Sequence, residues 1–154
     1  MKKSFILAGA ISITALLVLA ATRTEQSGEF GDLIKKIYAA WSTLDADNAA
    51  PFYAKDADLT FFDLAPLKYT HGWKEYSDNF RTNVATVFTN LVMTANDDLK
   101  VTKKGDLAFT TSTFHLAIKS KDGSPMEFDG RHTLIWEKRD GKWLIIHEHA
   151  SKPL

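Results

Sequence analysis

Apolar residues recur at helical spacing in the first half of the chain and at alternate positions in the second half. Asp32 is a good N-cap, and one apolar stripe follows it, at positions 33, 34, 37, 38, 41 and 44. Further segments predict a short helix at 49–54, a short strand at 59–63 and a third helix at 73–87. Period-two segments at 91–103, 107–119, 127–138 and 143–151 predict four strands. This order predicts an α+β fold with three helices packed on a strongly curved antiparallel sheet.

Glycine and aspartate separate the predicted strands at residues 104–106, 122–125 and 139–141, which is typical of hairpin turns. A bent sheet wrapped over helices leaves a conical cavity between the two layers. Such a cavity is the first place to expect a binding site.

The first 21 residues have the pattern of a secretory signal. Lys2 and Lys3 precede an uncharged apolar run that ends in small residues at Ala20 and Ala21. We therefore expect a signal peptide at 1–21, a linker at 22–31, a folded domain at 32–154, and export to the periplasm or the medium. An uncleaved membrane anchor is the alternative, because the run approaches the length that spans a bilayer.

Composition narrows the possible partners. The chain has 19 basic and 19 acidic residues, and without Lys2 and Lys3 the formal charge becomes −2. No basic cluster is present, so we expect no nucleic-acid partner. The chain has no cysteine and therefore no disulfide. It contains no phosphate loop, dinucleotide-binding glycine pattern, nucleophile elbow or paired-cysteine motif, and we expect neither a cofactor nor a metal.

Residues 136–151, Trp-Glu-Lys-Arg-Asp-Gly-Lys-Trp-Leu-Ile-Ile-His-Glu-His-Ala-Ser, resemble a known closing hairpin. The hairpin that they resemble closes the sheet in the calcium/calmodulin-dependent protein kinase II association domain and in SnoaL-like and ketosteroid-isomerase-like proteins. The resemblance extends from Asp32 to the C-terminus and implies the NTF2-like cone fold. It does not imply one function, since the fold hosts isomerases, dehydratases, cyclases, oligomerisation modules and non-enzymes.

The resemblance also places individual residues. Glu148 falls where SnoaL-like cyclases carry a catalytic aspartate, and His115 falls where the kinase domain carries a pocket arginine. The catalytic aspartate and tyrosine of ketosteroid isomerase fall at Phe61 and Ile37, so isomerase chemistry is not carried over.

Strand registers follow from the turns. A three-residue loop at 139–141 would place His132 opposite Glu148, and a symmetric loop at 121–126 would place His115 opposite His132. We therefore expect these three side chains together on the cavity face. The apolar part of that wall would comprise Leu134, Trp136, Leu144 and Ile146. Trp143, Ile145 and His147 would then lie on the outer face, within a homodimer interface, although a single bulge would exchange the two faces.

The candidate catalytic residues are His132, Glu148 and Asp63, because a histidine beside a carboxylate is suited to general acid/base chemistry. Asp63 follows two phenylalanines at the end of a strand, where an acid has no obvious structural role. The alternative is a buried hydrogen-bonded network that only positions the core. Tyr38, Trp41, Tyr76 and His115 complete the predicted ligand-binding wall, and Tyr38 and Trp41 also suit simple core positions.

Three functions remain open from the sequence. The first is binding of a small apolar molecule by an exported protein, and the second is cofactor-independent isomerase, dehydratase or cyclase activity on a small carbonyl compound. The third is oligomerisation or partner binding. Contact with a membrane is expected only through an uncleaved signal segment.

Overall fold

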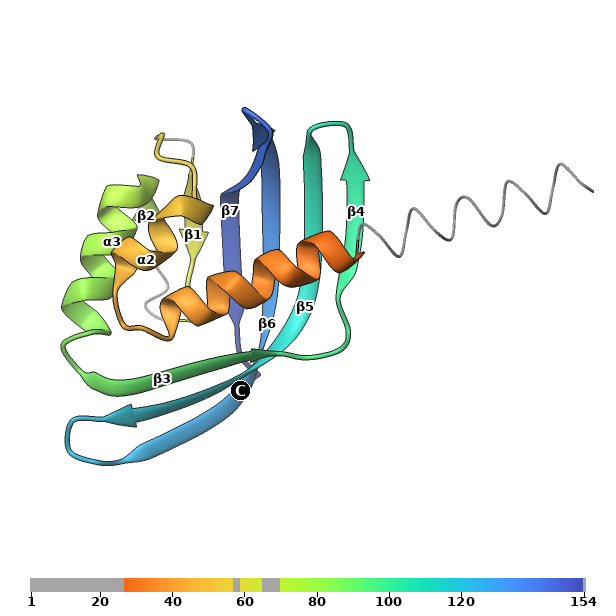
Figure 1. Cartoon of the computed structure of the whole chain (residues 1–154). Coiled ribbons are helices and arrows are strands. Elements are labelled where there is room, and N and C mark those ends of the chain that lie inside the picture. Colours follow the sequence, from red (N-terminus) through yellow and green to blue (C-terminus); the bar gives the residue numbers. More distant parts are fainter. Residues whose placement is uncertain (1–26, 57–58, 65–69, 154) are drawn as a thin grey trace, which may run out of the picture.

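The computed structural model describes residues 27–56, 59–64 and 70–153, which form helices packed against one curved sheet (Figure 1). The helical elements are a helix over residues 27–41, α2 (Ala46–Ala49), the 3-10 helix η1 (Ala50–Phe52) and α3 (Gly72–Asn83). The strands are β1 (Thr60–Phe62), β2 (Thr70–His71), β3 (Phe88–Ala95), β4 (Lys100–Lys104), β5 (Leu107–Ser120), β6 (Pro125–Arg139) and β7 (Lys142–Ser151). The predicted α+β cone is confirmed. The predicted signal segment lies outside the described residues.

The seven described strands have the order β2-β1-β7-β6-β5-β3, with β4 also paired to β5. All pairs are antiparallel except β1 with β7, which is parallel. The long strands β5, β6 and β7 form the centre, and the helix over residues 27–41 crosses the face of the sheet (Figure 1). Within the described residues, no helix has both the length and the apolar character needed to cross a membrane.

The first helix begins earlier than predicted. Residues 27–31 are already helical, so Asp32 is an interior residue rather than an N-cap, and the predicted linker at 22–31 is wrong for its second half. Phe30 explains the difference, because its side chain is fully buried and contacts the rings of Trp136 and Trp143 at centroid distances of 5.4 and 5.1 Å. These contacts extend the apolar stripe by one turn.

Two other boundaries differ from the prediction. The second helix starts at Ala46, not at residue 49, because the Asp45 side chain accepts a hydrogen bond from the Asp47 N–H and caps it. The strand predicted at 91–103 is interrupted between β3 and β4. There the Asp98 carboxylate accepts hydrogen bonds from the N–H and the hydroxyl of Thr113, at 2.9 Å each, in place of a backbone partner.

The β6–β7 hairpin has a two-residue turn rather than the predicted three-residue loop. Arg139 pairs with Lys142, and both Asp140 and Gly141 have positive φ, as a type I′ turn requires. The register then shifts at a bulge in which Ile146 is the extra residue, since Trp136 pairs with Ile145 and Ile135 with His147.

The faces of β7 therefore differ from the prediction. Trp143 and Ile145 are buried in the core at 6% and 0% exposure, so placing them in an outer dimer interface was wrong. Leu144 is only partly buried and lies outside the cavity wall that it was expected to join.

The β5–β6 register also differs. Lys119 pairs with Pro125, so Ser112 lies opposite His132 and His115 lies opposite Asp129. This shift by an odd number of residues turns His115 to the outer face. The expected proximity of His115 to His132 was therefore wrong.

Candidate functional site

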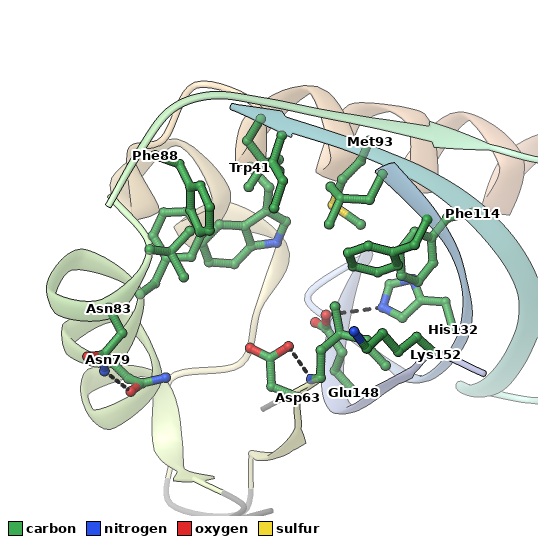
Figure 2. A pocket seen from close by; sticks show the side chains of 18 of the residues that line it. Trp41, Asp63, Asn79, Asn83, Phe88, Met93, Phe114, His132, Glu148 and Lys152 are labelled. Atoms are coloured by element: carbon green, nitrogen blue, oxygen red, sulfur yellow. Dashed lines mark hydrogen bonds and ion pairs between the residues drawn. The ribbon is translucent and has the colours of Figure 1, made fainter. Parts of the chain in front are cut away.

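A cavity of about 360 Å³ lies between the helices and the concave face of the sheet (Figure 2). Its walls are mostly apolar, with His132, Glu148 and Lys152 on one side and Asn79 and Asn83 of α3 on the other (Figure 2). The apolar lining residues are Trp41, Leu64, Tyr76, Phe80, Val84, Phe88, Leu91, Met93, Phe114, Leu116, Ile118, Met126, Phe128 and Ala150. The polar lining residues are Asp63, Asn79, Asn83, His132, Glu148 and Lys152. Such a lining suits a small amphipathic molecule.

His132 of β6 and Glu148 of β7 form a buried pair in the cavity wall. Leu134 is the direct ladder partner of Glu148, and Ala150 is that of His132. The His132 and Glu148 side chains therefore meet diagonally across the ladder. His132 Nε2 lies 3.1 Å from Glu148 Oε1, and the residues are 3% and 8% exposed. They share a face because the bulge at Ile146 returns Glu148 to the concave side.

Aromatic hydroxyls complete the bonding of this pair. The Tyr38 hydroxyl lies 2.8 Å from His132 Nδ1, and the Tyr53 hydroxyl donates to Glu148 Oε2 at 2.6 Å. The Tyr53 hydroxyl in turn accepts from the Trp41 indole N–H at 2.9 Å. Burial, reinforced by the Glu148 carboxylate, raises the pKa of Tyr53 well above its ordinary value. This tyrosine therefore remains a neutral donor.

The network leaves little free capacity at His132 and Glu148. Each ring nitrogen and each carboxylate oxygen already has a hydrogen-bond partner within the chain. A ligand would have to displace one of these bonds to reach the histidine nitrogens. The pair is thus suited to fixing the cavity wall and its charge more than to direct contact with a ligand.

Asp63 also lines the cavity, and its Oδ2 makes no hydrogen bond within the described residues. It follows β1, and its Oδ1 accepts from the Leu64 N–H at 2.7 Å. Burial is the main cause that raises the pKa of Asp63, and the nearby Glu148 carboxylate adds to it. Its carboxyl therefore keeps its proton to higher pH than an ordinary aspartate and can act as a hydrogen-bond donor.

Tyr76 of α3 is the second group with unused capacity. Its ring stacks on Phe61 with centroids 3.5 Å apart, and the residue is 6% exposed. Its hydroxyl makes no hydrogen bond within the part of the chain that the structure describes, although the residue lines the cavity. Burial raises the pKa of Tyr76 well above its ordinary value, so the hydroxyl is a donor.

The predicted site residues separate into two groups. His132, Glu148, Asp63, Trp41 and Tyr76 line the cavity together, as expected. The predicted residues outside its lining are Tyr38, His115, Leu134, Trp136 and Ile146.

Those outside the lining have other roles. Tyr38 lies behind His132 and supports it. Leu134 and Trp136 are buried in the core at 1% and 0% exposure, so they do not line the cavity as predicted. Ile146 is the bulge residue, and its predicted contact was wrong for that reason. His115 lies on the outer face, paired with Asp129 at 3.0 Å, so its place in the site was also wrong.

Several cavity residues were missed from the sequence. Phe128 lies four positions before His132 on β6, and Lys152 lies four positions after Glu148, just past β7. Residues an even number of positions apart share a face, so the same period-two pattern could have found them. Tyr53 gave no such signal, because it follows η1 and reaches Glu148 only through tertiary packing.

No group of three histidine, cysteine, aspartate or glutamate residues is arranged to hold a metal ion in the described ranges. The arrangement provides a shaped apolar space, two unused hydrogen-bonding groups and a fixed histidine–carboxylate pair behind them.

Comparisons with known proteins agree with this fold. No curated protein matches the chain. An NTF2-like superfamily protein from Salmonella enterica serovar Typhimurium superposes with a TM-score of 0.76 at 19% identity, covering 85% of this chain and 93% of that one. A Xanthomonas campestris protein is provisionally named a calcium/calmodulin-dependent protein kinase II association domain. It superposes with a TM-score of 0.71 at 25% identity, covering 81% of this chain and 86% of that one.

A third similar structure, from Streptomyces avermitilis, is provisionally named a dehydratase of the NTF2-like family. It gives a TM-score of 0.71 at 17% identity, covering 87% of this chain and 98% of that one. The model of the SnoaL-like domain family matches residues 31–154. This protein therefore belongs to the SnoaL-like domain family, within the NTF2-like fold.

Proposed function

We propose that this protein binds a small, mainly apolar molecule whose one polar oxygen enters the end of the cavity at Asp63 and Tyr76. The observation that carries the proposal is the unused bonding capacity of these two side chains in a mostly apolar cavity. A buried polar group without a partner costs about 1–3 kcal/mol, so a ligand oxygen that accepts from them recovers part of that cost.

The apolar walls supply the rest of the affinity. The space is enclosed by aromatic and thioether groups from four elements, namely Phe80, Phe88, Met93, Phe114 and Phe128. Each square ångström of apolar ligand surface removed from water contributes about 25 cal/mol. The cavity is accordingly suited to a compact ring system or a short branched chain.

Acid/base catalysis is the second candidate function. The observation that favours it is the raised pKa of Asp63. A general acid works best when its pKa lies near the working pH, and the pKa of Asp63 lies closer to neutral pH than that of an ordinary aspartate. Elimination of water from a small carbonyl compound is one reaction that a positioned carboxyl can assist, and the similar Streptomyces avermitilis protein is provisionally named a dehydratase.

We also propose export and self-association. The apolar segment before residue 22 supports removal of a signal peptide. The outer face of the sheet supports a homodimer, because Val92 and Phe109 are 44% and 43% exposed there.

Binding can be tested with matched probes and calorimetry. We expect 2-acetylnaphthalene to bind about five- to tenfold more tightly than 2-isopropylnaphthalene, which has a similar shape without the oxygen. Tyr76→Phe and Asp63→Ala should reduce this preference, whereas Asp106→Ala, at an exposed turn, should not. If neither probe binds, the proposal is wrong. If both bind equally, the cavity is a binding site but the polar groups are not its specificity element.

A further inference from the structure

Lys152 is the one lysine or arginine among the described residues lining the cavity. It follows β7 by one residue and continues the alternation that places Glu148 and Ala150 on the concave face. Its side chain reaches back toward the end of the cavity that holds Asp63 and Glu148 (Figure 2).

The ammonium group has no carboxylate partner in the described part of the chain. Its recorded contact is with the ring of Phe128, whose centroid lies 5.2 Å from Nζ. Arg139 and Arg81 differ in this respect, because Arg139 pairs with Asp56 and Glu137, and Arg81 pairs with Asp47 and Asp78. The lysine therefore brings an uncompensated positive charge to the cavity mouth.

Neither of the two nearby acids forms an ion pair with Lys152 in the described residues. Both Glu148 oxygens are engaged by Tyr53 and His132, and the residue is 8% exposed. Burial raises the pKa of Asp63, which favours its uncharged form. An acidic ligand group beside Lys152 would thus meet a cation flanked by a bonded carboxylate and a largely buried carboxyl.

We propose that the cavity selects small apolar organic acids, with the ligand's carboxylate paired to the Lys152 ammonium and its apolar body between the aromatic walls. This inference rests on the proposed function, since it names the class of molecule that the cavity takes. The lysine acts as a specificity-determining residue, because an amide or ester of the same shape gains nothing from its charge.

The test compares 2-naphthoate with 2-naphthamide, which have nearly the same shape and differ in charge. Calorimetric titration of the wild-type protein should give about three- to tenfold tighter binding of the acid, the usual scale for a partly exposed charge pair. The preference should weaken as salt is raised. Lys152→Met should remove it, so that acid and amide bind about equally, and Lys104→Met, at an exposed lysine outside the cavity, should retain it.

The outcomes separate the two proposals. Equal affinity for acid and amide in the wild type, or a preference that survives Lys152→Met, overturns the acid selectivity and leaves cavity binding intact. If none of the four probes binds (2-naphthoate, 2-naphthamide, 2-acetylnaphthalene and 2-isopropylnaphthalene), the binding function is overturned, and this inference with it. Thermal unfolding of each variant confirms that the comparison is made on folded protein.

Discussion

Replacing His132 with alanine provides the sharpest test of the buried network. The imidazole is 3% exposed, bonds Tyr38 through one nitrogen and Glu148 through the other, and lies against the rings of Tyr38 and Phe114 at 5.6 and 6.0 Å. Alanine removes both hydrogen bonds and the ring contacts together.

The expected loss of stability follows from the groups left behind. Each buried polar group deprived of its partner costs about 1–3 kcal/mol. Glu148 keeps its bond from Tyr53, whereas the Tyr38 hydroxyl loses its partner at His132. We therefore expect His132→Ala to lower the free energy of unfolding by about 2–4 kcal/mol, with the cost of the vacated ring volume included.

Urea unfolding followed by tryptophan fluorescence measures this change, and His115→Ala is the matched control. His115 also contacts acidic groups, Asp129 at 3.0 Å and Glu127 at 3.9 Å, but its side chain is 42% exposed. Its loss should change stability by less than about 0.5 kcal/mol. Equal effects of the two substitutions would refute the argument that burial and double bonding make His132 a structural centre.

Three further predictions concern other parts of the chain. Tyr53→Phe should cost about 1–3 kcal/mol in the same unfolding assay, because it removes the donor to Glu148; an unchanged midpoint would contradict the 2.6 Å bond. Because the folded pKa of Asp63 is raised, the folded protein holds that proton more tightly than the unfolded chain. Stability should therefore fall as pH rises from about 3.9 through the raised value. Asp63→Asn should flatten this decline, and a decline of the same size in both proteins would count against it. Expression in a secreting host should yield a mature chain cleaved near residue 20 or 21, as mass spectrometry would show; intact protein confined to the cytosol would oppose export.

Much of the architecture could be predicted because each element carries its own local signal. The stripe around Ile34, Ile37 and Trp41 identifies the first helix, and alternation with glycine turns identifies the last three strands. The helix start was missed because Phe30 is held by Trp136 and Trp143, more than a hundred residues away, and no local pattern encodes that contact.

The site shows why strand pairing is harder to predict than strand position. Directly paired residues share a face, so an error of one residue in a turn exchanges the faces of every following position. In the β5–β6 hairpin nothing compensates, and His115 lies outside although it was expected inside.

The β6–β7 hairpin contains two deviations of one residue each, which add to a register shift of two residues and so restore the predicted face. Its turn is one residue shorter than expected, which brings Trp143 and Ile145 to the concave face. The extra residue at Ile146 then reverses the alternation, so that Glu148 returns to the side of His132 two positions from its predicted partner. Because both deviations lie between the turn and the site, the predicted pair forms even though the register that predicted it does not. Glu148 therefore reaches His132 diagonally, which leaves its second oxygen for Tyr53 and completes the wall behind Asp63.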